Sequence, residues 1–204
     1  MDRTFADPDL ALAASGASGG PPEIAAGPPS GRAGLLSLLL AADERLLVAA
    51  RRWHGPWRTR AARALTRAGD ASSWTLVVLA LAATPQAVAA RLGLRLGVAT
   101  LLATAASQWL KRRLSRPRPT SAIQGFSALA ENPDAFSFPS GHTCAAAAAA
   151  VALAGAGLLG PAAALLALGI ALSRVYLGAH YPLDVAAGAM LGTFAGALAR
   201  LLVA

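Results

Sequence analysis

The chain has 204 residues, of which 55% are hydrophobic and only 14% charged, whereas an average soluble domain has about 25% charged residues. With a mean hydropathy of +0.51, it has too little polar surface to cover a water-soluble globule, which indicates a protein that lies in a lipid bilayer. The net charge of +8 would also suit nucleic acid, but nucleic-acid-binding proteins do not carry several long apolar segments, so we expect no nucleic-acid partner.

Residues 1–33 are rich in Gly, Pro, Ala and Ser and have almost no bulky apolar side chain. Such a composition cannot offset the entropy lost on ordering, so we expect a disordered tail. Residues 34–204 are expected to form a single domain, because the chain is too short for two. Cys144 is the only cysteine, which excludes an intrachain disulfide and a thiolate metal site.

Residues 34–72 are predicted to form helices that lie in the membrane interface. The apolar stretch from Leu35 to Trp57 is interrupted by Asp43-Glu44-Arg45, and three charges make a membrane span costly, so an amphipathic helix is favoured. A second short helix is expected from Thr59 to Ala68, with arginines along one solvated or headgroup-facing side.

Residues 73–204 contain the apolar stretches that can cross a bilayer. Each is close to the ~20 residues that a span needs, and their many Ala and Gly residues would let helices pack closely. The sequence therefore predicts an all-α, multi-pass integral-membrane bundle, with the plasma membrane as its expected location. We place about five transmembrane helices at 74–90, 93–110, 141–159, 161–178 and 184–203.

Three polar blocks stand at the boundaries of these spans, and the number of crossings puts all three on one side. The first runs from Lys111 to Pro119 and includes Arg118. By itself, a basic run after a span is best explained as a topology signal or a headgroup contact.

The second block is Pro139-Ser140-Gly141-His142. Ser140 suits the N-cap of a helix, and Gly141 lets a ligand approach the backbone. The free N–H groups of a helix start form an anion site, which would place His142 beside a bound phosphate. Taken by itself, this tetrapeptide is better explained as an ordinary capped helix with a nearby histidine.

The third block contains Arg174, His180 and Asp184. His180 and Asp184 are four residues apart, so they share a face wherever the chain is helical. A carboxylate bonded to one imidazole nitrogen makes the other a better nucleophile. A charged residue such as Arg174 at the end of a span is usually functional. A snorkelling arginine and a His-Asp helix cap remain the alternative for this block taken alone.

Taken together, the three blocks resemble the type 2 phosphatidic acid phosphatase superfamily. Its pattern is Lys, six residues, Arg-Pro; then Pro-Ser-Gly-His; then Ser-Arg, five residues, His, three residues, Asp. The sequence matches this pattern throughout, from Lys111 to Asp184. The resemblance implies that His180 is the nucleophile, that Asp184 fixes its tautomer, and that His142 protonates the leaving group.

The same resemblance implies that the phosphoryl oxygens are held by a second set of residues, namely Lys111, Arg118, Arg174, the Ser140 hydroxyl and the Gly141 N–H. Three fixed cations can stabilise the transferred phosphoryl group without Mg²⁺, so we expect no metal and no cofactor. His54 lies outside all three blocks and is expected at the membrane interface.

The resulting prediction is a membrane phosphatase that acts on a lipid through a phosphohistidine. Polyprenyl diphosphate or monophosphate is favoured as the substrate, with phosphatidic acid, phosphatidylglycerol phosphate or a polyprenyl-linked sugar phosphate as alternatives. A non-catalytic protein that binds phospholipid headgroups and a vanadate-dependent haloperoxidase are the competing interpretations.

The distribution of basic residues also predicts the orientation. Nine arginines outside the expected phosphate ligands lie on the side of the three blocks, and only Arg91, Arg95 and Arg200 lie on the other. Because basic residues accumulate on the cytoplasmic side of a membrane, we expect the site to face the cytoplasm.

Overall fold

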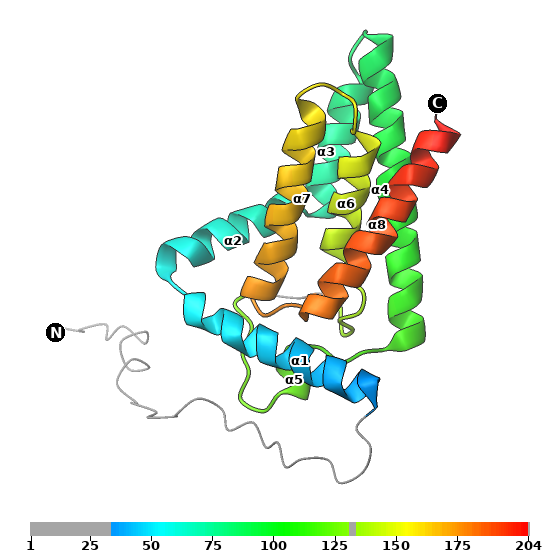
Figure 1. The fold of residues 1–204 in the computed structure, drawn as a ribbon. Coiled ribbons are helices and arrows are strands. Elements are labelled where there is room, and N and C mark those ends of the chain that lie inside the picture. Colours follow the sequence, from blue (N-terminus) through cyan, green and yellow to red (C-terminus); the bar gives the residue numbers. More distant parts are fainter. Residues whose placement is uncertain (1–33, 131–133, 204) are drawn as a thin grey trace, which may run out of the picture.

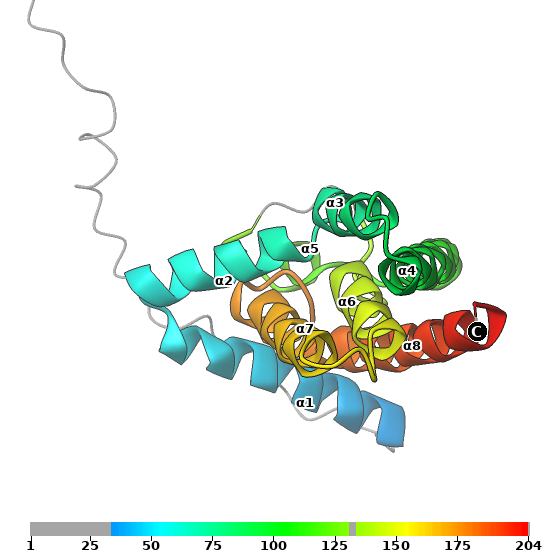
Figure 2. The same cartoon turned by 90° about the horizontal axis from the view of Figure 1, so that it is seen from above.

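The computed structural model describes residues 34–130 and 134–203, so the disordered tail expected at 1–33 lies outside the described residues. Within the described ranges, the regular elements are helices, apart from an isolated bridge between Pro117 and Phe136. The long helices run side by side, and one helix crosses beneath them (Figures 1 and 2). The elements are α1 Leu35–Ala50, the 3₁₀ turn η2 Arg51–Trp53, α2 Pro56–Ala68, α3 Ala71–Ala82, α4 Ala87–Leu114, α5 Pro119–Ala122, α6 Gly141–Ala152, α7 Leu159–Tyr176 and α8 Pro182–Leu202.

The N-terminal segment forms two helices outside the bundle, as the sequence predicts, with α1 crossing beneath it (Figure 1). The helix expected up to Trp57 ends earlier, at Ala50, because the chain turns at Gly55 and Pro56 occupies the first position of α2, where proline is well tolerated. In α1, Asp43 and Leu47 face the bundle, whereas most of its leucines are exposed.

The expected boundary between the first two spans is wrong. We expected stretches at 74–90 and 93–110, but α3 ends at Ala82 and α4 already begins at Ala87. The cause is Pro85, because a proline disfavours helical backbone in the residue before it. Helix α4 then continues for 28 residues to Leu114, a length of about 42 Å.

Three of the described helices, α4, α7 and α8, are long and apolar enough to cross a membrane. Helices α3 and α6 are apolar but have 12 residues each, about 18 Å against the ~30 Å of a bilayer core. The number of five transmembrane helices therefore stays a prediction. Exposed leucines on α3, α4 and α7 would contact lipid tails, because a water-soluble monomer rarely exposes so much apolar surface.

The centre of the bundle is a close contact between α6 and α8. Small side chains fill it, including Cys144, Ala148 and Ala195, all of which are almost completely buried. At Gly192 an added Cβ would lie only 2.1 Å from the Cys144 carbonyl oxygen. The two backbones can approach this closely because α8 has glycine there.

Candidate active site

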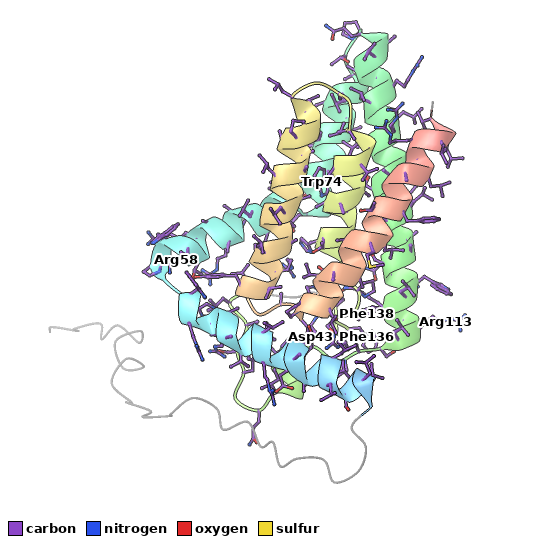
Figure 3. All side chains as sticks on the ribbon, viewed as in Figure 1. Asp43, Arg58, Trp74, Arg113, Phe136 and Phe138 are labelled. Atoms are coloured by element: carbon purple, nitrogen blue, oxygen red, sulfur yellow. The ribbon has the colours of Figure 1, made fainter. Side chains whose placement is uncertain are left out.

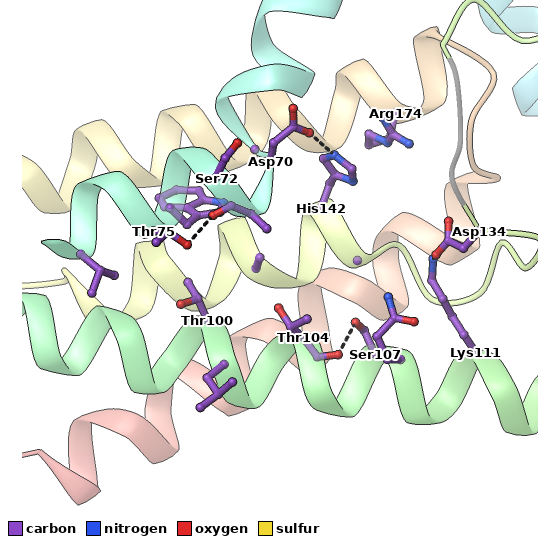
Figure 4. Close-up of a pocket in the computed structure, with 18 of the residues that line it drawn as sticks. Asp70, Ser72, Thr75, Thr100, Thr104, Ser107, Lys111, Asp134, His142 and Arg174 are labelled. Atoms are coloured by element: carbon purple, nitrogen blue, oxygen red, sulfur yellow. Dashed lines mark hydrogen bonds and ion pairs between the residues drawn. The ribbon is translucent and has the colours of Figure 1, made fainter.

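A cavity of about 810 Å³ opens among α3, α4 and α6 at the end of the bundle where the polar blocks meet (Figure 4). Six of the eight predicted site residues line it. They are Lys111, Arg118, Gly141, His142, Arg174 and His180. The structure thus brings both imidazoles and the three expected cations to one cavity.

His180 lies in the turn between α7 and α8 and is 1% exposed. Its Nδ1 is 3.5 Å from Oδ2 of Asp184, which is longer than an ordinary hydrogen bond. The pKa of His180 is lowered to about 4, chiefly by burial and also by the nearby Arg174 and Arg118, against the opposing effect of Asp184. The imidazole is therefore neutral at pH 7, as a nucleophile must be.

Asp184 is completely buried and does not line the cavity. It sits in the first turn of α8, where its Oδ2 accepts the N–H of Tyr181 at 2.9 Å. This bond holds the carboxylate behind the imidazole, the position expected of a group that orients a histidine.

His142 begins α6, and its Nε2 lies 2.9 Å from Oδ1 of Asp70, the residue before α3 (Figure 4). Each histidine therefore has a carboxylate neighbour. Asp70 was not predicted as a site residue from the sequence. Its position just before the helical Ala71-Ser72-Ser73 could only have suggested an N-cap.

Two of the expected phosphate-binding cations, Lys111 and Arg118, are both paired with Asp134. The Arg118 Nη1 also donates to the carbonyl of Ala179 at 2.7 Å and lies 3.5 Å from Nε2 of His180. Burial raises the pKa of the Asp134 carboxyl, but Lys111 and Arg118 outweigh this and hold it below its usual range. Asp134 was not predicted from the sequence either, although its carboxylate pairs with both cations.

Arg174 comes from the last turn of α7 and is 2% exposed. Its Nη1 lies 3.5 Å from the Thr66 hydroxyl, which is itself 2.8 Å from the Ser173 hydroxyl. These contacts tie α2 to the end of α7 and hold the guanidinium at the cavity.

The two residues before His142 behave differently from each other. Gly141 lines the cavity at the first position of α6, where helix N–H groups are free to bind an anion. Ser140, in contrast, is fully buried and lies behind the cavity lining. Its hydroxyl accepts from Thr143 at 3.1 Å, and its N–H donates to the Asp184 carbonyl at 2.9 Å. Ser140 therefore joins α6 to α8 instead of reaching into the cavity as expected.

His54 does not line the cavity. Its Nε2 lies 2.9 Å from the Tyr176 carbonyl oxygen, so it ties the start of α2 to the end of α7. The expectation for His54 was a position at the membrane interface, and this contact was not predicted.

Two further charged residues stand behind the site, Asp43 on α1 and Arg116 before α5. Arg116 donates to Asp184 at 2.6 Å and to Asp43 at 2.7 Å. Neither residue was assigned a role at the site from the sequence. Asp43 stands four residues before the apolar Leu47, and this spacing puts both on the same face of a helix. The spacing is the one feature of the sequence that could have indicated a buried position for Asp43.

Within residues 34–130 and 134–203, no three His, Cys, Asp or Glu side chains gather as a metal-binding group would need. The cations at the cavity are the side chains of Lys111, Arg118 and Arg174, which all line the same space. A site with two imidazoles and three such cations is suited to hold a phosphoryl group and to move protons to and from it.

The fold and this cavity define the protein as a helical membrane protein with a site suited to phosphoryl transfer. The family model of the PAP2 superfamily matches residues 92–204, more than half of the chain. The chain therefore belongs to the PAP2 superfamily, and the resemblance stated from the sequence is confirmed.

Similar proteins agree with this assignment. The chain is 39% identical over 127 residues to the decaprenylphosphoryl-5-phosphoribose phosphatase of Mycolicibacterium smegmatis, covering 62% of this chain and 69% of the relative. It is 32% identical over 110 residues to the undecaprenyl-diphosphatase of Sulfolobus acidocaldarius, covering 51% and 52%. The crystal structure of a PAP2-type phosphatidylglycerolphosphate phosphatase from Bacillus subtilis superimposes with a TM-score of 0.66 at 26% identity, covering 81% and 86%.

The chain is accordingly an integral-membrane phosphatase, a hydrolase of phosphoric ester or anhydride bonds. This sets aside the interpretation as a non-catalytic headgroup-binding protein. It also sets aside the haloperoxidase alternative, because the similar proteins are phosphatases and the fold is that of a membrane phosphatase.

Proposed function

We propose that the enzyme removes a terminal phosphate from a polyprenyl-linked lipid in the plasma membrane, without a metal ion, through a phosphohistidine on His180. The observation that carries the proposal is that His142 and His180 line one cavity together with Lys111, Arg118 and Arg174.

In the first step, the three cations and the Gly141 N–H hold the non-bridging phosphoryl oxygens. Nε2 of His180 attacks phosphorus while the bond from phosphorus to the lipid oxygen breaks. His142 donates its proton to that leaving oxygen, and Asp70 supports the protonated imidazole from 2.9 Å away. Asp184, at 3.5 Å from Nδ1, stabilises the positive charge on the phosphorylated imidazole.

In the second step, His142 is neutral and takes a proton from a water molecule that attacks the phosphohistidine. The bond between phosphorus and Nε2 breaks, inorganic phosphate leaves, and His180 returns to its neutral form. His142 is then protonated again and ready for the next substrate.

The rest of the cavity lining supports a lipid substrate. Apolar side chains of Trp74, Val78 and Leu79 on α3 and Leu101 on α4 form its walls away from the cations. These apolar walls suit a prenyl tail, because ligand pockets bury the hydrocarbon part of a ligand against apolar and aromatic side chains.

Several hydroxyl groups line the same cavity and favour a polar linker in the substrate. They can bind a sugar phosphate placed between the prenyl tail and the terminal phosphate. The relative from M. smegmatis, which is named for such a lipid, supports this choice over a bare diphosphate. The hydroxyl-bearing residues are Ser72, Thr75, Thr100, Thr104 and Ser107 (Figure 4).

The test is phosphate release from a panel of lipids by the purified protein in the presence of EDTA. The panel holds a polyprenyl phosphosugar with a terminal phosphate, a polyprenyl diphosphate, phosphatidic acid and phosphatidylglycerol phosphate. We expect activity to survive EDTA and to be highest with the phosphosugar lipid. Loss of activity that added Mg²⁺ restores would refute metal independence, and a preference for a glycerolipid would refute the polyprenyl assignment.

The variant His180→Ala tests the nucleophile, with His54→Gln as the control because His54 is outside the cavity. We expect His180→Ala to lower kcat by about 10⁴-fold or more, as for removal of other catalytic nucleophiles. Rapid quenching of His142→Ala with radiolabelled substrate should trap an acid-labile phosphorylated protein. An active His180→Ala protein would contradict the proposal.

A further inference from the structure

A buried chain of charged groups joins helix α1 to the histidine proposed as the nucleophile. Asp43 is 2% exposed and lies where α1 passes beneath α8 (Figure 3). Its Oδ2 accepts from Arg116 Nη2 at 2.7 Å, and its Oδ1 accepts the Leu183 N–H at 2.7 Å. The other end of the same guanidinium, Nη1, donates to Oδ1 of Asp184 at 2.6 Å.

The contacts of Asp184 show what this chain holds in place. One oxygen binds Arg116, and the other accepts the Tyr181 N–H at 2.9 Å and lies 3.5 Å from Nδ1 of His180. The guanidinium of Arg116 also lies over the Tyr181 ring, 4.0 Å from its centroid. The carboxylate is thus fixed from two sides and has little freedom to turn away from the imidazole.

Arg116 remains charged in this setting. Burial lowers its pKa, but the carboxylates of Asp43 and Asp184 more than offset that effect and raise the pKa above its ordinary value. Two buried carboxylates share one guanidinium, which leaves one negative charge to stabilise the positive imidazole of a phosphohistidine. Without Asp43, Arg116 would act on Asp184 alone and neutralise the charge that the imidazole needs.

We propose that Asp43 and Arg116 are positioning residues that hold Asp184, and through it His180, in the geometry and charge state of the reaction. The proposal rests on the function proposed above for His180. It makes α1 a part of the catalytic apparatus, although α1 lies outside residues 92–204, which the family model matches.

The two residues carry opposite charges, so their removal should shift the pH dependence in opposite directions. Loss of the Arg116 charge leaves Asp184 less neutralised, which favours protonated His180 and moves the acidic limb of the kcat profile to higher pH. Loss of the Asp43 charge has the reverse effect. The other charged and titratable groups around His180 are unchanged in both variants; they are Arg118, Arg174, Lys111, Asp134 and His142.

The experiment compares Asp43→Asn and Arg116→Gln with matched controls, Glu44→Gln on the same helix and the exposed Arg112→Gln. We expect kcat to fall about 10- to 100-fold in the two test variants, the cost typical of losing a partner that orients a catalytic ligand. KM should change by less than about threefold, because neither residue lines the cavity and only transition-state stabilisation is lost. The control variants should keep the wild-type kcat and KM.

The double variant Asp43→Asn/Arg116→Gln should be no slower than the worse single variant, because residues in one network are not additive. The proposal would be overturned in favour of general destabilisation if the acidic limbs of the two single variants shifted in the same direction. Losses of kcat that add up in the double variant would overturn it as well. If either variant does not purify as a monodisperse protein, Arg116→Lys and Asp43→Glu replace it. These two variants keep the charges but change the hydrogen-bond geometry, so kcat should fall while the acidic limb of the kcat profile stays at the wild-type pH. A wild-type kcat would again overturn the proposal.

The variant His180→Ala separates this inference from the function on which it rests. An inactive His180→Ala protein beside fully active Asp43→Asn and Arg116→Gln proteins refutes the positioning role alone. An active His180→Ala protein refutes the proposed function itself.

Discussion

Replacing Gly192 by alanine should damage both the stability and the activity of the protein, although Gly192 does not line the cavity. The new Cβ would stand 2.1 Å from the Cys144 carbonyl oxygen and 2.9 Å from its carbon. Both are rigid backbone atoms, so α8 must move away from α6 by about 1 Å to restore contact. Overpacking of this kind costs about 1–3 kcal/mol, of which up to about 1 kcal/mol is returned by the better helix propensity of alanine.

The same shift acts on the site, because α6 carries His142 whereas α8 carries Asp184 and follows His180. A displacement of about 1 Å between catalytic groups can lower the rate about 100-fold. We therefore expect Gly192→Ala to lower kcat by about that factor and to reduce Tm in detergent by a few degrees, since about 1 kcal/mol corresponds to roughly 2–4 °C at this size.

The assay is phosphate release, with thermal unfolding measured on the same preparation. Gly169→Ala on α7 is the control, since a Cβ there would meet only the flexible end of the Leu65 side chain at 3.1 Å. Wild-type kcat and Tm for Gly192→Ala would refute the idea that the contact between α6 and α8 sets the distance between the two histidines.

Three other predictions concern the charged groups of the site and its orientation. The pKa of His180 is lowered to about 4, so kcat/KM should fall only as the pH drops through about 4. The measured profile must first be corrected for the second ionisation of the substrate phosphate near pH 6. A fall of the corrected kcat/KM near pH 6.5 would contradict this prediction. Asp134→Asn should let inorganic phosphate inhibit at about tenfold lower concentration, equal to about 1.4 kcal/mol, because Lys111 and Arg118 lose a competing carboxylate; weaker inhibition would show that Asp134 helps the cations to bind phosphate. A cysteine at the exposed Thr120, in a Cys144→Ala background, should resist an impermeant thiol reagent on intact cells if the site faces the cytoplasm, and labelling would refute that orientation.

The helical membrane class followed from composition and hydrophobic pattern. Long apolar stretches leave few alternatives in a bilayer, because every backbone polar group must be bonded within its own helix. The exact helix ends were harder to predict from the sequence. Pro85 shifted the start of α4 to Ala87, and Gly55-Pro56 divided the interfacial segment, since local backbone preferences override a smooth hydropathy signal.

Partners of the site residues show a second limit of sequence-based inference. His142 and His180 could be chosen because they stand in recognisable local patterns. Asp70 and Asp134 could not, because they approach His142 and the cations only after distant segments pack together. A lone carboxylate in a turn gives no sign of the group that it will contact.

The sequence by itself determined the choice of candidate site residues, because the spacing within each polar block and the apolar spans between them are properties of the linear chain. Only the tertiary structure decided which carboxylate serves which cation or imidazole, that Ser140 lies behind the cavity, and that Asp43 on α1 reaches Arg116. These contacts join residues that are far apart in the chain. The contact between Asp43 and Arg116 exists because α1 crosses beneath the bundle, and Ser140 is held behind the cavity because its N–H donates to the carbonyl of Asp184 on α8.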